Sequence, residues 1–218
     1  MLELNRPFNR RLIGLTGGIA TGKSTVSDYL SKTYHLPILD ADEYAKEAVN
    51  LGSPILKSIQ NRYGPKILQP TGELNRQQLG EIIFADPKEK QWLETQIHPW
   101  VIQRLQQELQ VLASSPMVVL SIPLLFEANL TYLVNEIWVV YAHPEQQIQR
   151  LQSRNGFTLA QAQQRLQSQW PLTQKIPQAD RVLDNTRDLS HLYQQINQAV
   201  KLTTLSATDS LQPLKTGF

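Results

Sequence analysis

The chain has 218 residues, with 21 Lys and Arg against 19 Asp and Glu, so its formal net charge at pH 7 is +2. A charge this close to neutral argues against a dedicated nucleic-acid-binding protein, which usually presents a basic surface. The absence of cysteine excludes disulfides, thiolate metal sites and cysteine nucleophiles. The length favours one domain with insertions over two separate domains.

The distribution of apolar residues predicts a protein that does not enter a membrane. The most apolar stretch, Met117–Phe126, is much shorter than the roughly 20 residues that a transmembrane helix needs, and the N-terminal residues lack the apolar core of a signal peptide. We therefore expect a cytoplasmic protein, either a monomer or a small homo-oligomer, that binds neither membranes nor nucleic acid.

Short apolar runs alternate with amphipathic segments along the chain. Buried parallel strands read as continuous apolar runs, and strands that alternate with helices join through right-handed crossovers. This order predicts an α/β fold with three layers, in which helices cover a central five-stranded parallel sheet. The expected strands are Arg11–Thr16, Leu36–Leu39, Met117–Ile122, Glu136–Tyr141 and Arg181–Leu183.

The first strand leads into Gly17–Ser24, GGIATGKS, which fits the phosphate-loop pattern G-x-x-x-x-G-K-[ST], and a helical pattern follows to Tyr34. We expect Gly17 and Gly22 to adopt backbone angles that other residues resist, so that amides surround a phosphate. Lys23 would then contact the β- and γ-phosphates, and the Ser24 hydroxyl would ligate Mg²⁺. A glycine-rich turn without a ligand is the alternative.

Two aspartates follow the second strand, in the sequence Leu39-Asp40-Ala41-Asp42. Ligands of such sheets bind at the carboxyl ends of the strands, so this loop is expected to face the same crevice as the phosphate loop. A carboxylate there could accept a proton from an attacking hydroxyl or order Mg²⁺ through water. Alternatively, Asp40 or Asp42 only caps a helix that begins near Glu43.

Residues 53–112 carry no strand pattern, which predicts a helical insertion. Asp86 is expected to cap a helix that has Pro87 at its first position. Pro99 is expected to break that helix and leave His98 at the junction of two helical pieces. From this pattern alone, a packing or capping role for His98 is favoured.

Residues 150–177 are rich in Gln and Arg and could form a mobile flap. Gly156 is expected to end one helix and Thr158 to cap the next. Arg150 and Arg154 are four residues apart, so they share one helix face; two solvated arginines would show the same spacing. After Thr203 the apolar periodicity is weak, and residues 205–218 are expected to form a frayed tail.

The motifs LTGGIATGKST, LDAD, IHP, SIPLLFE and DRVLDN occur in an order and at separations that resemble the dephospho-coenzyme A kinase family. The resemblance covers Leu12–Leu202. It implies a single phosphate-loop kinase domain at residues 11–204, in which the helical insertion binds the acceptor and residues 150–177 form a lid. The implied reaction is the ATP- and Mg²⁺-dependent phosphorylation of the ribose 3′-hydroxyl of dephospho-CoA, the last step of coenzyme A biosynthesis.

The resemblance also implies roles for particular residues. Asp42 is the implied general base, and Lys23, Arg150 and Arg154 neutralise charge on the transferring phosphoryl group. Ser24 is the implied ligand of the metal ion. The implied ATP-binding residues are Gly17, Ala20, Thr21, Gly22, Lys23, Ser24, Thr25 and, at the adenine, Asn185. The implied dephospho-CoA-binding residues are His98, Leu124, Leu125, Phe126 and Glu127.

Two departures from the family pattern stand out. Many relatives carry Gly-Ser where this chain has Ala20-Thr21, and Asp is frequent where this chain has Asn155. Neither change removes a group that phosphoryl transfer needs. Another small-molecule kinase and a non-catalytic nucleotide-binding module remain rival interpretations. A switch GTPase is disfavoured, because neither N-K-x-D nor D-x-x-G occurs in the sequence.

Overall fold

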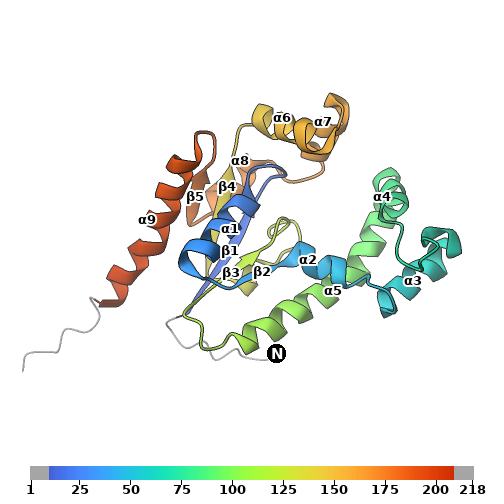
Figure 1. Ribbon diagram of the computed structural model, residues 1–218, viewed down its shortest axis with the longest axis horizontal. Helices are drawn as coiled ribbons and strands as arrows, with labels where there is room; N and C mark the ends of the chain where they lie inside the picture. The colour runs from blue at the N-terminus through green and yellow to red at the C-terminus, as the bar shows by residue number, and fades with distance from the viewer. Residues whose placement is uncertain (1–9, 209–218) are drawn as a thin grey trace, which may run out of the picture. The chain divides into compact units, whose positions relative to one another are not determined.

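The computed structural model of the chain describes the backbone of residues 10–208 and the side chains of residues 10–201 (Figure 1). Its strands form one sheet in the order β2-β3-β1-β4-β5. β1 pairs in parallel with β3 and with β4, and β4 pairs in parallel with β5. The predicted five-stranded parallel sheet is confirmed. The strands are β1 Arg11–Gly17, β2 Ile38–Asp40, β3 Met117–Ser121, β4 Glu136–Tyr141 and β5 Arg181–Asp184.

The chain divides into two compact units. Leu39–Ser115 forms one unit, which is largely helical, and the residues before and after it form the other. The helices are α1 Lys23–Tyr34, α2 Ala41–Glu47, α3 Pro54–Tyr63, α4 Arg76–Ala85, α5 Pro87–Val111, α6 Pro144–Asn155, α7 Leu159–Gln167, α8 Leu172–Lys175 and α9 Leu189–Thr208. Short 3-10 turns lie at η1 Pro65–Ile67, η2 Thr131–Leu133 and η3 Ile176–Gln178.

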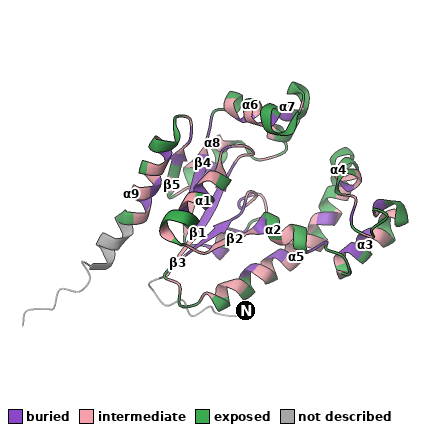
Figure 2. Ribbon diagram, in the orientation of Figure 1, coloured by how far each residue is buried: buried purple, intermediate pink, exposed green. Residues whose placement is uncertain are grey.

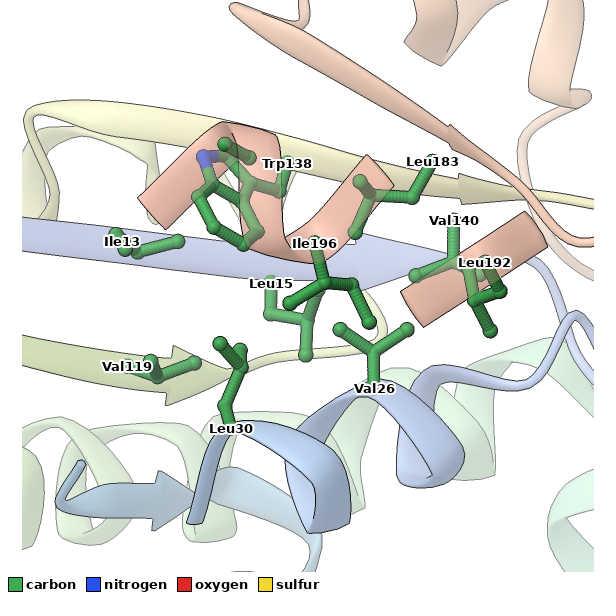
Figure 3. Close-up of a cluster of buried hydrophobic side chains, with 11 residues drawn as sticks. Ile13, Leu15, Val26, Leu30, Val119, Trp138, Val140, Leu183, Leu192 and Ile196 are labelled. Carbon is green, nitrogen blue, oxygen red and sulfur yellow. The ribbon is translucent and has the colours of Figure 1, made fainter. Parts of the chain in front are cut away.

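The core of the unit formed by the residues before Leu39 and after Ser115 lies between the sheet and two helices, α1 and α9, that pack on the same face (Figure 3). Every second residue of β1 and β4 points into this core, as the period of a strand requires. The strands are therefore mostly buried, while α6 and α7 expose much of their surface (Figure 2). The core residues are Ile13, Leu15, Val26, Leu30, Val119, Trp138, Val140, Leu183, Leu192, Ile196 and Ala199.

β1, β3 and β5 each end one residue away from the expected position, and the bounds of β2 and α9 need a larger correction. β2 is Ile38–Asp40 instead of Leu36–Leu39, because Pro37 has no amide to donate, although its carbonyl accepts a hydrogen bond from Val119. α9 continues to Thr208, past the predicted end of regular structure at Thr203. The rest of the predicted tail, residues 209–218, lies outside the described residues.

The prediction that Pro99 breaks its helix is wrong. Asp86 caps α5 and Pro87 begins it, as expected, but the helix then continues through Pro99 to Val111. A proline inside a helix costs about 3 kcal/mol, partly because the carbonyl four residues earlier loses its partner. Here Pro99 and that residue, Thr95, are both exposed, so water can satisfy the carbonyl. Packing holds the helix on both sides, through the buried residues Leu93, Val101 and Leu105.

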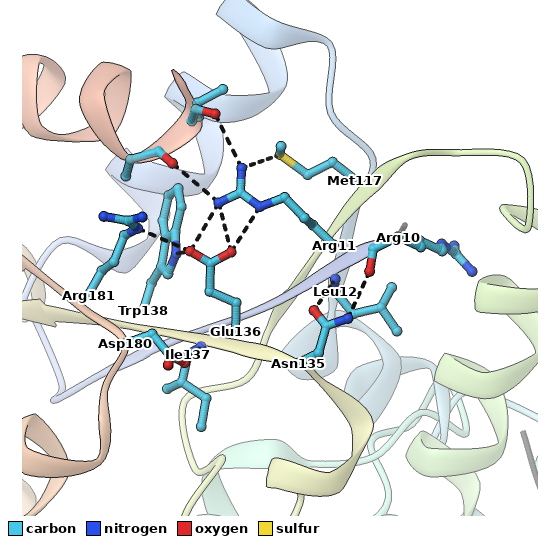
Figure 4. Close-up of polar contacts among 12 residues, drawn as sticks. Arg10, Arg11, Leu12, Met117, Asn135, Glu136, Ile137, Trp138, Asp180 and Arg181 are labelled. Carbon is cyan, nitrogen blue, oxygen red and sulfur yellow. Dashed lines mark hydrogen bonds and ion pairs between the residues drawn. The ribbon is translucent and has the colours of Figure 1, made fainter. Parts of the chain in front are cut away.

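A half-buried carboxylate, Glu136, joins β1, β4 and β5 near the amino ends of these strands (Figure 4). The Arg11 guanidinium donates to both oxygens of Glu136, at 2.9 and 3.0 Å. Trp138 Nε1 donates to Glu136 Oε1 at 2.8 Å and Arg181 Nε to the same oxygen at 3.1 Å. Burial opposes the charge on Glu136, but the hydrogen bonds from Trp138 and Arg11 hold the pKa of this carboxyl below its ordinary value.

This lowered pKa predicts a pH-dependent contribution to stability. The stabilisation by Glu136 should be fully present above the pKa of an unfolded Glu, about 4.3, and should be lost as the pH falls through the lower pKa of the folded state. Glu136→Gln should therefore lower the free energy of unfolding by about 1–3 kcal/mol at pH 7, with the difference shrinking below pH 4. Urea denaturation at several pH values measures this difference. Glu94→Gln, which alters the exposed Lys90–Glu94 pair, is the control and should change the free energy of unfolding little at any of these pH values.

Candidate active site

The two glycines of the phosphate-loop pattern lie at the start and at the end of the turn between β1 and α1 (Figure 1), and they have different structural roles. Gly22 has a φ of 101°, as expected. The expectation of an unusual backbone angle at Gly17 is wrong, since φ is positive at Gly22 and not at Gly17. Gly17 is needed for space: a Cβ atom there would lie 2.7 Å from Thr21 Oγ1 and 2.8 Å from the Val140 carbonyl oxygen.

Ala20 has a φ of 59°, in the left-handed region that alanine rarely adopts. Arg150 holds this part of the loop from outside. Its Nη1 donates to the carbonyl oxygens of Ala20 at 3.1 Å and Thr21 at 3.2 Å, and its Nη2 donates to the Asn185 carbonyl at 3.0 Å. Arg150 is therefore not one of two solvated arginines, because its guanidinium is bound to backbone oxygens of the loop.

Asn185, which directly follows β5, is 5% exposed and packs against the same turn. Its Nδ2 donates to the Thr21 carbonyl at 2.7 Å. Thr21 is buried, and its hydroxyl closes the turn by donating to the Gly18 carbonyl at 2.9 Å. The amide of Asn185 thus supports the loop from the side of Gly22, where a Cβ atom would lie 2.1 Å from Asn185 Nδ2.

This close approach predicts that Gly22→Ala is damaging. The added methyl group needs both an unfavourable φ and a displaced Asn185, so we expect a loss of about 2–4 kcal/mol in the free energy of unfolding. Nucleotide affinity should fall with it. Gly80→Ala is the matched control, because Gly80 lies inside α4 with no atom within 4 Å of the new Cβ. That change should stabilise the protein by about 0.5–1 kcal/mol. Thermal denaturation and titration with an ATP analogue measure both effects.

Two glutamines that sequence reasoning missed also hold the loop. Gln147 Nε2 donates to the Ile19 carbonyl at 2.5 Å, and the Ile19 amide donates to Gln169 Oε1 at 2.8 Å. Gln147 lies one turn before Arg150 on α6, so the helix spacing could have indicated it. Gln169 stands in a glutamine-rich stretch, and nothing in the sequence distinguishes it from its neighbours.

Lys23 lies in the first turn of α1, where the helix dipole and the free amides favour an anion. No acidic residue occupies this turn. Lys23 Nζ donates to the hydroxyl of Ser121 at 2.5 Å. Ser121 is a buried residue at the end of β3 that sequence reasoning missed, although its parallel pairing with Leu15 places it beside the loop. Ser24 is exposed and Thr25 is half-buried in the same turn.

The structure separates the two aspartates of the LDAD motif. Asp40 is the N-cap of α2, and its Oδ1 accepts a hydrogen bond from the Asp42 amide at 2.9 Å. The helix begins at Ala41, earlier than the predicted start near Glu43. Asp42 lies inside the first turn, so its carboxylate does not serve as the cap. The sequence left open which of the two aspartates caps the helix, and in the structure Asp40 is the cap.

The residues of the PLLFE motif lie in the turn after β3. Leu125 and Phe126 are buried, and Leu124 is half-buried. Glu127 turns toward α8, where its carboxylate lies 2.7 Å from Lys175 Nζ. His98, the remaining predicted acceptor residue, is half-buried on α5 in the helical unit.

The predicted helix boundaries in residues 150–177 are confirmed. Gly156 ends α6 with a φ of 67°, and Thr158 begins α7 with a capping box. Arg154 is exposed at the end of α6, and its Nε donates to Asn155 Oδ1 at 3.1 Å. An asparagine at this position therefore keeps a hydrogen bond to Arg154 without the charge of an aspartate.

Within residues 10–208, no helix is long and apolar enough to cross a membrane. The same part of the chain contains no group of three or more His, Asp or Glu side chains placed to hold a metal ion. A magnesium ion at a phosphate loop does not need such a group, because substrate phosphates and water supply most of its ligands.

The fold and the site define a phosphate-loop nucleotide-binding protein: a parallel sheet leads into a glycine-rich loop, and a lysine lies in the first turn of α1. The family model described as "Dephospho-CoA kinase" matches residues 11–191. The chain belongs to this family. It is accordingly a kinase that uses ATP and acts on a small molecule.

Known relatives agree with this assignment. The dephospho-CoA kinase of Synechococcus elongatus is 57% identical over 194 residues, which is 89% of this chain and 93% of that protein. The Synechocystis enzyme of the same name is 56% identical, covering 89% and 96%. Among solved structures, TT1252 from Thermus thermophilus has a TM-score of 0.77 at 33% identity, covering 90% of this chain and 98% of that one. Dephospho-CoA kinase from Campylobacter jejuni shares the fold, with a TM-score of 0.66 at 24% identity and coverage of 90% and 98%.

Proposed function

We propose that the chain transfers the γ-phosphoryl group of ATP to the ribose 3′-hydroxyl of dephospho-CoA, which yields coenzyme A and ADP in the last step of coenzyme A biosynthesis. The observation that carries this proposal is the braced phosphate loop with Lys23 in the first turn of α1, in a chain of this family. A kinase needs such a preformed cradle, because phosphoryl transfer depends mainly on positioning and charge neutralisation.

The donor would bind along the loop from Gly17 to Thr25. Ala20, Thr21 and Gly22 form its turn, Lys23 would lie against the β- and γ-phosphates, and Asn185 would border the adenine. Ser24 fits a role as the magnesium ligand, because its hydroxyl is exposed beside Lys23 at the start of α1. Bound there, the metal ion would neutralise phosphate charge.

Asp42 would be the general base. The argument rests on the local structure: Asp40 is occupied as the cap of α2, whereas the Asp42 carboxylate belongs to the first turn and does not cap it. The carboxyl ends of strands in such a sheet border the ligand crevice, and α2 directly follows β2. Asp42 would orient the attacking hydroxyl and accept its proton late in the transfer, since the transition state is loose.

The two arginines of α6 would act differently. Arg150 already donates to the Ala20, Thr21 and Asn185 carbonyls, so it would shape the loop while placing a positive charge beside it. Arg154 is exposed at the end of the helix and would neutralise the transferring phosphoryl group when residues 150–177 cover the nucleotide. Such closure would exclude water and limit ATP hydrolysis.

Dephospho-CoA would contact His98 and the turn from Leu124 to Glu127. Glu127 Oε2 is buried and has no hydrogen-bond partner among the described residues. A buried oxygen without a partner is costly, so a donor on the bound acceptor would improve its environment. The cytoplasmic location, the absence of nucleic-acid binding and a monomeric or small oligomeric state remain predictions from the sequence.

A substrate panel tests the proposal. We expect kcat/KM for dephospho-CoA to exceed that for nucleoside monophosphates and shikimate-like alcohols by at least about 10³-fold, since a site that hydrogen-bonds its substrate rejects analogues lacking those groups. A coupled ADP assay provides the measurement. A preference for a nucleoside monophosphate or a small alcohol would identify another kinase of the same fold. No turnover with any acceptor would favour a nucleotide-binding module.

A further inference from the structure

One fully buried cation has no place in the reaction described so far. Lys175, the last residue of α8, is 0% exposed, and its ammonium group contacts Glu127 Oε1 at 2.7 Å and the Pro123 carbonyl oxygen at 3.4 Å. Burying a lysine is expensive unless a partner compensates its charge. The pair therefore stands only while the turn at residues 123–127 and α8 are both in place.

Hydrogen bonds connect this pair to the phosphate loop at two points, just before Gly17 and at Ile19. On one side, the Pro123 carbonyl that accepts from Lys175 also accepts from the Thr16 hydroxyl at 3.0 Å. Thr16 is fully buried and directly precedes Gly17. The strand that enters the phosphate loop is thus tied to the turn that carries the predicted acceptor residues.

The other side returns to the same loop through the segment between α7 and α8. Glu127 Oε1 also accepts from the Trp170 amide at 3.0 Å. The preceding residue, Gln169, accepts from the Ile19 amide at 2.8 Å. The contacts therefore form a closed ring, from Thr16 through Pro123, Lys175, Glu127, Trp170 and Gln169 back to Ile19.

We propose that Lys175 is a positioning residue that couples the two ligand loops: the phosphate loop, which binds the nucleotide, and the turn at residues 123–127, which binds the acceptor. This inference rests on the proposed function for the assignment of those two loops. Because one buried pair fixes both loops, a ligand that orders one of them lowers the conformational entropy that the other ligand must remove. Nucleotide and acceptor then bind with positive cooperativity, and by linkage the effect is reciprocal.

A purely structural ion pair predicts something else. Its loss would lower the free energy of unfolding but would not change how strongly the binding of one ligand affects the binding of the other. The coupling factor, the ratio of the acceptor Kd values without and with bound nucleotide, therefore separates the two roles. A measurement of stability alone does not separate the two roles, because both predict a less stable variant.

The experiment is calorimetric titration of dephospho-CoA, with and without a non-hydrolysable ATP analogue, well below the denaturation temperature. For the unchanged protein we expect the analogue to tighten acceptor binding at least about five-fold. In Lys175→Met this factor should fall to about one. Gln169→Ala should lower it too, and since Gln169 is only half-buried, that variant remains informative if Lys175→Met does not fold. Lys32→Met, on the exposed surface of α1, is the control and should keep the full factor.

The outcomes are distinct for the two proposals. Failure of the unchanged protein to bind dephospho-CoA would reject the proposed function itself. Binding of both ligands without mutual influence would overturn the coupling and leave the proposed function standing. Retention of the full factor in Gln169→Ala, or in a folded Lys175→Met protein, would reduce the ring to a structural support.

Discussion

Replacing Lys23 with alanine is expected to lower kcat by at least about 10³-fold, the scale on which a preorganised charge at a transferring phosphoryl group acts. Lys23 lies in the first turn of α1, where it adds a full positive charge to the partial charge of the helix end. Its Nζ is already oriented by Ser121, so the charge requires little rearrangement when phosphates bind. Steady-state kinetics with dephospho-CoA, together with ATP-analogue binding, measure the loss.

The same helix offers a matched control. Lys32 lies in the last turn of α1 with a side chain that is 79% exposed, near Asp28. Lys32→Ala removes the same charge from the same helix and should leave kcat within two-fold of the unchanged protein, because exposed pairs contribute little. A Lys23→Ala enzyme that keeps a tenth or more of the original kcat would contradict the role assigned to the phosphate loop.

Asp42→Asn is the second change with a large expected effect. It removes the proposed base while keeping the size and backbone of the residue, so kcat should fall by about 10²-fold or more, the usual contribution of a general base. ATP affinity should stay unchanged, since the donor is proposed to bind at the phosphate loop. The measurement therefore pairs kcat with the Kd of an ATP analogue.

Asp40→Asn tests whether the effect belongs to Asp42. Asparagine caps helices about as well as aspartate, so the contact between residue 40 and the Asp42 amide can persist. We expect this control to keep both stability and turnover. Near-normal turnover in Asp42→Asn with a large loss in Asp40→Asn would assign the base to Asp40 instead.

The sheet could be predicted from the sequence because its information is local. The strands are short apolar runs that can be recognised in the sequence. The expected span of β4, Glu136–Tyr141, agrees with the structure residue by residue. Caps at Asp86 and Thr158 could be predicted for the same reason, since each depends on one side chain and the next few amides.

The prediction of a helix break at Pro99 was wrong because the stability of the helix there depends on packing against residues elsewhere in the fold. The proline rule describes the cost to an isolated helix, whereas Leu93, Val101 and Leu105 bury their side chains on both sides of it. The left-handed backbone conformation of Ala20 could not be predicted from the sequence either. This conformation is held by Arg150, which is far away in the chain and became visible as a partner only in the fold.

The candidate site shows the same division. The phosphate loop could be identified from its motif, and the LDAD motif limited the choice of base to two residues. The contacts of Ser121, Gln147, Gln169 and Lys175 could not be predicted, because each joins residues that are far apart in the sequence. A lysine in a glutamine-rich stretch reads as a surface residue until the fold buries it.

The most direct test of the central claim is to follow the label from [γ-³²P]ATP during incubation with the purified chain and dephospho-CoA. The account predicts one labelled coenzyme A for each ADP formed, with the label on the ribose 3′-oxygen, and a rate of label transfer at least about 10³-fold lower for Lys23→Ala. Release of labelled inorganic phosphate without labelled coenzyme A, or label on any other oxygen of the acceptor, would contradict it.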